Sequence, residues 1–157
     1  MSFKISTFVA CATLSCAVLA ALTFSAPVLA DGDGEIKYRQ FVMKSIGGHM
    51  GGMASIIKGQ TGNKANFQTH ASGLAALSKI AGSVFPDGSD FGETQALPVI
   101  WEKPDDFAKA VKMFQSAAEN LEKVARSGDM TKFGEAFGGL GKSCKNCHEN
   151  FREKKKQ

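Results

Sequence analysis

The sequence predicts an all-α protein, an antiparallel up-down-up-down four-helix bundle. After residue 30, apolar residues recur at alternating steps of three and four along four segments. Gly, Pro and Asp separate these segments, and none of them alternates in the manner of a strand. Two of the three links are short and one is long, which fits such a bundle.

Residues 1–30 differ in composition from the rest of the chain. They contain no acidic residue, and a basic Lys4 precedes an apolar run and the small residues Val28-Leu29-Ala30. This pattern is typical of a secretory signal peptide cleaved after Ala30. A retained membrane anchor is the alternative, but Ser, Thr and Pro interrupt the run, and a spanning helix needs about 20 apolar residues. We therefore expect export to the periplasm and a single domain over residues 31–157.

The first expected helix covers residues 34–58. Its apolar stripe consists of Ile36, Met43, Ile46, Met50, Met53 and Ile57. Four glycines interrupt it, at positions 47, 48, 51 and 52, and each costs up to about 1 kcal/mol relative to alanine. Either another helix, a subunit or a flat cofactor approaches the backbone there, or the helix kinks or frays. The sequence leaves both open.

The second expected helix begins near Asn63, a plausible N-cap, and ends before Phe85-Pro86-Asp87-Gly88. Its stripe consists of Phe67, His70, Leu74, Leu77, Ala81 and Val84. A connection of about 15 residues follows, longer than most helix–helix links. It contains Phe91, Pro98, Ile100 and Trp101, so we expect it to pack on the bundle.

The third expected helix opens at Pro104, because proline suits the first helical position. Its stripe consists of Phe107, Val111, Phe114, Ala118, Leu121 and Ala125. Asp129 caps the fourth expected helix. That helix has the stripe Phe133, Phe137, Leu140, Cys144, Cys147 and Phe151, so both cysteines face the core.

Cys144-Lys145-Asn146-Cys147-His148 has the spacing of a c-type haem attachment motif. Residues three apart on a helix face the same way, so both thiols can add to the two vinyl groups on one porphyrin edge. His148 can then bind the iron. We expect one covalent haem c near the C-terminal helix.

Other uses of two cysteines fit this chain less well. A structural zinc site needs four ligands, and only His49 and His70 remain as partners. A thiol–disulfide redox pair is expected in a βαβ context, and no strand is predicted here. Because Lys4 is the only charged residue of the first 30, the remaining chain has a net charge of +3, too mild to indicate nucleic-acid binding.

With this motif near the C-terminus of four helices, the chain resembles the class II cytochromes c, the cytochrome c′ family. The most similar parts are residues 141–152, residues 38–44 and the loop segment Leu97-Pro98-Val99-Ile100-Trp101, which lies against the haem in that family. The resemblance implies that Arg39 and Gln40 reach the haem propionates. It also places Arg152 near the proximal histidine, and Gln95 is a weaker candidate contact. Each could instead be an ordinary surface residue.

Met43 occupies the distal position of the family's first helix. Met43-Lys44 resembles the low-spin branch of the family, in which methionine supplies the sixth iron ligand. A thioether raises the haem potential and suits electron transfer. The alternative is that Met43 only fills the core, as methionine on a helical stripe often does.

Two functions follow from this resemblance. The first is a periplasmic electron carrier, not an enzyme, with His148 and Met43 as axial ligands and redox proteins as partners. The alternative is a five-coordinate high-spin protein that binds nitric oxide or carbon monoxide. The resemblance also implies a possible homodimer through the first two helices. His49 and His70 match no ligand position of the family, and the basic tail at residues 154–156 can steer an acidic partner.

Overall fold

The computed structural model describes residues 31–154, and the expected signal peptide lies outside these residues. Four long helices form an antiparallel bundle: α1 (Gly32–Ile57), α2 (Phe67–Ile80), α4 (Pro104–Ser127) and α5 (Met130–Phe151). A 3₁₀ turn, η1 (Lys64–Asn66), precedes α2, and the short helix α3 (Val99–Glu102) precedes α4. The predicted all-α fold and up-down-up-down order are confirmed. Residues 31–154 contain no strand, only an isolated bridge between Ala96 and Arg152.

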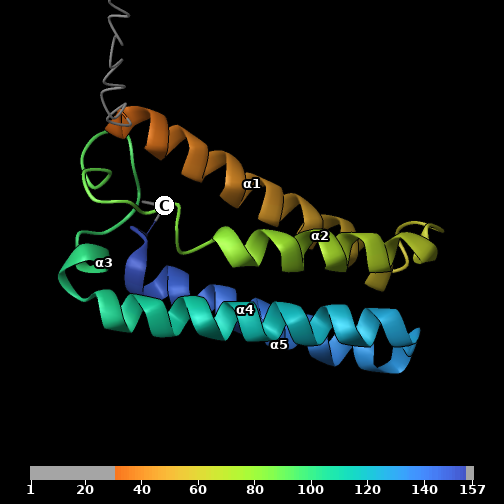
Figure 1. Ribbon diagram of the computed structural model, residues 1–157. Coiled ribbons are helices and arrows are strands. Elements are labelled where there is room, and N and C mark those ends of the chain that lie inside the picture. The colour runs from red at the N-terminus through yellow and green to blue at the C-terminus, as the bar shows by residue number, and fades with distance from the viewer. Residues whose placement is uncertain (1–30, 155–157) are drawn as a thin grey trace, which may run out of the picture.

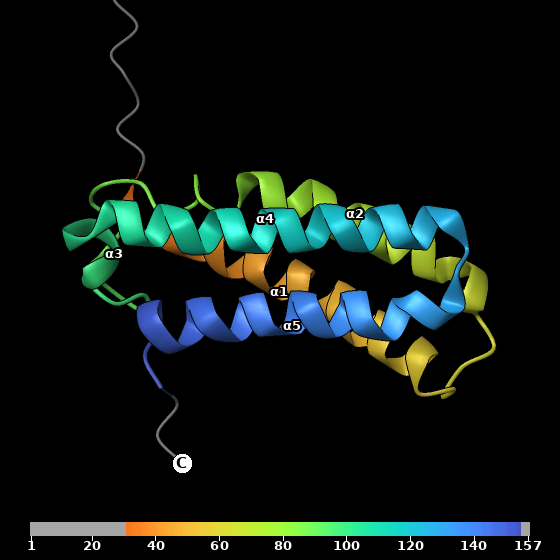
Figure 2. The same ribbon diagram turned by 90° about the horizontal axis from the view of Figure 1, so that it is seen from below.

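The helices form two layers, with α1 and α2 over α4 and α5 (Figure 1). The contacts between long helices lie mainly in the pairs α1–α2, α2–α4 and α4–α5, whereas α1 and α5 hardly meet. The α1–α2 and α4–α5 links lie at one end, which we call the turn end (Figure 2). The other end, the connection end, holds the connection 81–98, α3 and the last turns of α5. Toward the connection end, α1 slopes away from α2 (Figure 1).

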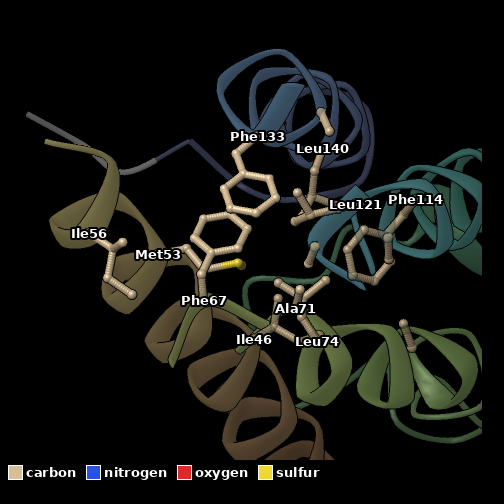
Figure 3. Close-up of a cluster of buried hydrophobic side chains, with 14 of the residues drawn as sticks. Ile46, Met53, Ile56, Phe67, Ala71, Leu74, Phe114, Leu121, Phe133 and Leu140 are labelled. Atoms are coloured by element: carbon tan, nitrogen blue, oxygen red, sulfur yellow. The ribbon is translucent and has the colours of Figure 1, made fainter. Parts of the chain in front are cut away.

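The main hydrophobic core lies between α1, α2, α4 and α5 (Figure 3). The Phe67 ring of α2 stacks on Phe133 of α5, with centroids 4.4 Å apart and planes within 1° of parallel. Met53 of α1 and Leu121 of α4 are both completely buried. Because a buried large side chain contributes about 1.5–3 kcal/mol, this region fixes how the helices pack.

The predicted apolar stripes match the buried faces closely in α4 and α5 and less well in α1. In α1 the structure buries Ile36, Ile46 and Met53 as expected, but Ile56 in place of Ile57, which is 39% exposed. Two adjacent isoleucines fit the apolar pattern about equally, so the sequence could not choose between them. Arg39, a charged residue, is also buried on this helix.

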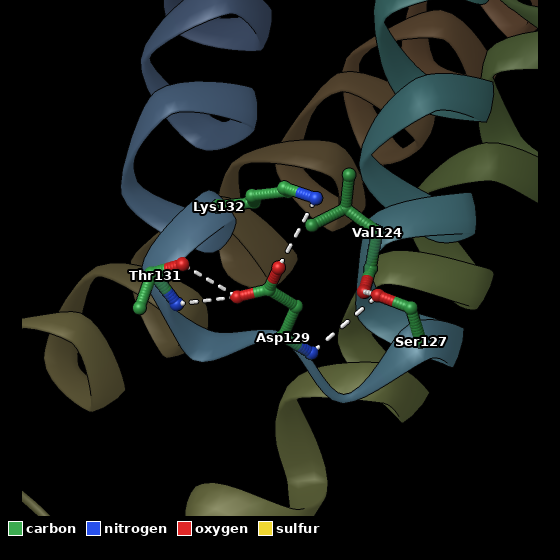
Figure 4. Close-up of polar contacts among 5 residues, drawn as sticks. All are labelled: Val124, Ser127, Asp129, Thr131 and Lys132. Carbon is green, nitrogen blue, oxygen red and sulfur yellow. Dashed lines mark hydrogen bonds and ion pairs between the residues drawn. The ribbon is translucent and has the colours of Figure 1, made fainter.

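The helix starts differ in how well they were predicted. Asp129 caps α5 as expected: its carboxylate accepts hydrogen bonds from the Thr131 backbone N (3.1 Å) and hydroxyl (2.6 Å), as Figure 4 shows. The expected α2 cap at Asn63 is wrong. The Asn63 amide donates to the Thr61 hydroxyl instead (3.0 Å), and the 3₁₀ turn separates it from α2.

The glycines of α1 do not break it, because the helix runs without interruption from Gly32 to Ile57. A Cβ placed on Gly47, Gly48 or Gly51 would meet no atom within 4 Å. A Cβ on Gly52 would lie 2.8 Å from the His70 ring of α2. Close approach therefore explains Gly52, and nothing in the structure explains the other three.

Candidate haem-binding site

Cys144 and Cys147 lie on the last turns of α5, at the connection end. Both are half-buried, and neither forms a disulfide. Cys144 packs against the main core, and Cys147 packs against a second apolar cluster that contains Phe107 and Phe151. The helix therefore holds two thiols on one face, directed at the interior of the bundle.

The electrostatics of the thiols argue against a disulfide redox site. Burial raises the pKa of Cys144, and burial together with Cys144 raises the pKa of Cys147 to about 11. Reactive redox cysteines have lowered pKa values instead. The raised pKa values therefore do not favour a thiol–disulfide redox site.

His148 follows Cys147 directly and is the group expected to bind the iron. Its side chain is exposed at the surface of α5, and its pKa is lowered by partial desolvation first and by the positive charge of Arg152 second. A neutral imidazole is the form that binds a metal. Arg152 lies next to it in space, since its backbone N donates to the His148 carbonyl (3.3 Å) at the end of α5. The haem-site role that the resemblance implies for Arg152 stays a prediction.

Arg39 is the most unusual polar residue of this end, because only 4% of it is exposed. Its guanidinium donates to the Ser89 hydroxyl (2.8 Å), the Ser89 carbonyl (2.9 Å) and the Thr94 hydroxyl (2.8 Å). It also lies 4.8 Å from the centre of the Phe85 ring. Among residues 31–154 no carboxylate forms an ion pair with it. Burial lowers the pKa of Arg39.

A buried cation without a carboxylate is costly unless other polar groups compensate. The hydrogen-bond partners of Arg39 are neutral oxygens, and the charge of Glu35 on the same helix offsets its burial only in part, because the pKa of Arg39 is still lowered. An anionic group placed beside Arg39 would balance its positive charge. Haem propionates are such groups, and Arg39 therefore fits the role that the resemblance implies.

The connection 81–98 links both sides of this end. On the α1 side, Gln40 Nε2 donates to the Glu93 carbonyl (2.8 Å). On the α5 side, Leu97 N donates to the Phe151 carbonyl (3.0 Å), and Glu153 N donates to the Gln95 carbonyl (2.8 Å). The connection therefore packs on the bundle, and Ile100 is buried as expected, but Phe91 does not take part, because it is 79% exposed.

Met43 lies on α1, half-buried, and packs against the main core, as does Cys144 of α5. Both side chains point into the same interior although α1 and α5 hardly meet. The residues present therefore fit a haem: two thiols on one face of α5, the imidazole of His148 beside them, and a buried cation whose hydrogen-bond partners are neutral oxygens.

Some of the site was not foreseen from the sequence. Ser89 and Thr94, which hold Arg39, carry no pattern that marks them, because only the folded connection brings them to α1. His49 and His70 are brought together at the α1–α2 contact, away from the cysteines. The sequence shows that each histidine lies on a helix, but it does not show that the two rings meet.

Comparison with known proteins agrees with this geometry. The family model described as Cytochrome C′ matches residues 34–152. The chain belongs to the cytochrome c′ family. A cytochrome c′ from Pararhodospirillum photometricum is 39% identical over 120 residues, which cover 75% of this chain and 95% of that protein.

Solved cytochrome c′ structures have the same fold. The protein from Shewanella frigidimarina has a TM-score of 0.75 and 37% identity, with 80% of this chain and 98% of that chain covered. A ferrous variant of the protein from Alcaligenes xylosoxidans with bound nitric oxide has a TM-score of 0.74 and 32% identity, over 80% and 98% of the two chains. A carbon monoxide-bound variant of the same protein matches equally well, with a TM-score of 0.74.

These comparisons establish the cofactor and the family, but not the narrower assignment to one branch of it. Cytochromes c′ carry one covalently bound haem c, as the motif predicts. The comparisons do not support the expected low-spin, methionine-ligated branch. Met43 packs against the core, a position that fits a space-filling methionine as well as an iron ligand.

Proposed function

We propose that this cytochrome c′ family protein binds nitric oxide or carbon monoxide at a five-coordinate haem iron. The observation that carries the proposal is the nitric oxide complex of its relative from Alcaligenes xylosoxidans, which shares the fold at 32% identity. The haem would be attached at Cys144 and Cys147, with His148 as its proximal ligand. When bound, the haem iron would supply the position at which the gas binds.

Several residues of this chain support that role. The two thiols lie one helical turn apart, so α5 fixes the haem edge to a rigid element. The lowered pKa of His148 keeps its imidazole unprotonated and available to the metal at neutral pH. The buried main core gives the bundle an apolar interior, which favours a neutral diatomic gas over polar ligands.

Arg39, Gln40 and Arg152 are proposed to orient the haem propionates. Arg39 is the best supported, because its buried charge has no carboxylate partner among residues 31–154. Gln40 is already tied to the Glu93 carbonyl, and exposed Arg152 lies next to His148. These contacts would set the tilt of the ring relative to α1.

A second candidate is the electron carrier in which Met43 supplies the sixth ligand and redox proteins are the partners. The specific observation in its favour is that Met43 packs inward against the same core as Cys144. Met43 and an added gas cannot both occupy the sixth position. One experiment therefore separates the two functions.

The test is a carbon monoxide titration of the ferrous holoprotein, followed by its optical spectrum. We expect the gas to bind the wild-type protein fully, and the Met43→Ala variant to bind it with similar affinity. If the wild-type protein resists carbon monoxide and Met43→Ala binds it readily, methionine ligation is correct and gas binding is not the function of the native protein.

Export also belongs to this proposal, with residues 1–30 as a cleaved signal peptide and the mature protein in the periplasm. No helix of the described residues is both long and apolar enough to cross a membrane. Amino-terminal sequencing of the protein from its host should begin at Asp31. A homodimer through α1 and α2 remains a proposal that sedimentation would test.

A further inference from the structure

His49 of α1 and His70 of α2 face each other at a place that the haem site does not use. Their Nδ1 atoms are 3.2 Å apart. The ring centroids are 5.4 Å apart, and the planes meet at 72°. Both residues are half-buried where the two helices pack.

Two glycines make this arrangement sterically possible. A Cβ on Gly73 of α2 would lie 2.6 Å from Cε1 of His49. A Cβ on Gly52 of α1 would lie 2.8 Å from Cε1 and Nε2 of His70. Each ring therefore lies on the bare backbone of the opposite helix, which turns the two Nδ1 atoms toward each other.

The spacing of the two nitrogens suits a shared metal ion. Zinc binds imidazole nitrogen at about 2.0–2.1 Å with tetrahedral angles, which places two ligating nitrogens about 3.3 Å apart. The observed Nδ1–Nδ1 distance is 3.2 Å. In the metal-free protein the same distance requires one nitrogen to donate and the other to accept.

We propose that His49 and His70 form a two-histidine site for a divalent transition-metal ion of the zinc or copper class, which clamps α1 to α2. No group of three or more His, Cys, Asp or Glu side chains gathers around a common point within residues 31–154. The protein thus supplies two ligands, and water completes the coordination. Imidazole suits these ions, whereas calcium and magnesium prefer oxygen.

The pKa of His49 agrees with this use. Burial lowers the pKa of His49, and the neighbouring His70 lowers it further. Metal binding requires neutral imidazole, so His49 is in the ligating form at neutral pH. The ion then replaces the single proton shared between the rings.

The test is calorimetric titration of the haem-loaded protein with zinc. The chain has only three histidines, and His148 is proposed to bind the haem iron, so His49 and His70 are the remaining imidazoles. We expect one zinc per chain and a higher melting temperature when zinc is present. In His49→Gln and in His70→Gln the affinity should fall by about tenfold or more.

A matched pair of glycine variants tests the geometry. Gly73→Ala should displace the His49 ring and weaken zinc binding, whereas Gly51→Ala, whose added Cβ meets no atom within 4 Å, should leave it unchanged. Zinc binding that is absent, or that is equal in the wild-type protein and both glutamine variants, overturns the proposal. The haem spectrum, read in the same samples, reports separately on the gas-binding function.

Discussion

The two ends of the bundle are built on different principles. The turn end is filled with apolar side chains, with Phe67 stacked on Phe133 and Met53 completely buried. The connection end holds a buried arginine and two half-buried thiols, which an apolar core alone would not need. This difference indicates that the turn end is a pure apolar core, whereas the connection end combines a smaller apolar cluster with the polar groups that the proposed haem site uses.

The largest expected effect comes from removing the two thiols at the connection end. Cys144→Ala combined with Cys147→Ala should abolish covalent haem attachment, because no thiol remains on α5 to form a thioether. A haem stain of a denaturing gel measures this. The neighbouring Ser143→Ala variant, which loses only a hydroxyl that donates to the Leu140 carbonyl (2.7 Å), should stain like the wild type. Retained stain in the double variant would contradict the assignment.

The next largest effect comes from a cavity in the main core toward the turn end. Leu121→Ala should lower the free energy of unfolding by about 2–5 kcal/mol, because it leaves a cavity at a completely buried position. On the same helix Met113 is 53% exposed, so Met113→Ala should change stability by less than about 0.5 kcal/mol. Denaturant unfolding of both variants gives the comparison. Equal losses would show that the core does not dominate stability.

A third prediction concerns the polar part of the connection end. Arg39→Met should lower the free energy of unfolding by about 1–3 kcal/mol, because the Ser89 carbonyl and the Thr94 hydroxyl lose their donor. It should also alter the haem spectrum, which the core variant Leu121→Ala should not. Arg39→Lys keeps the charge but not the planar set of donors, so we expect only partial recovery. If Arg39→Met lowers stability but leaves the haem spectrum unchanged, Arg39 does not contact the haem.

A smaller effect lies at the link between α4 and α5. Asp129→Ala should destabilise the protein by about 0.5–2 kcal/mol, since the Thr131 backbone N loses its acceptor. Asp129→Asn retains a capping oxygen and should lose much less. Thermal unfolding distinguishes them, and identical losses would mean that the cap contributes through charge alone.

The smallest effect is a pH dependence at the α1–α2 contact. The folded-state pKa of His49 is lowered, so protonation favours the unfolded chain. Its contribution to stability is therefore complete above the usual histidine pKa and is lost as the pH falls through the lowered value. Unfolding curves between about pH 7.5 and 5 should show this decline in the wild type and less of it in His49→Gln. An equal decline in both would assign the effect to other groups.

The two ends also differ in how far the sequence predicts them. The stripes of α4 and α5, the Asp129 cap and the inward cysteines follow from short-range periodicity, and the structure confirms them. The attachment motif is likewise local, and it gave the cofactor. These features depend on residues three or four positions apart, which is the range that a single sequence records well.

The features that escaped prediction depend on contacts between distant segments. Arg39 is held by Ser89 and Thr94, which lie 50 and 55 residues away in the chain. The His49–His70 contact spans 21 residues and two helices. Whether Met43 is a ligand or a core residue depends on its distance to an iron atom, which helical periodicity does not encode.

The most direct test of the central claim is the spin state of the ferric iron in the purified native protein. Electron paramagnetic resonance and the optical spectrum should show a high-spin, five-coordinate haem without a sulfur-to-iron charge-transfer band. A low-spin spectrum with that band, lost in Met43→Ala, would contradict the proposal that the iron is five-coordinate and open to a gas.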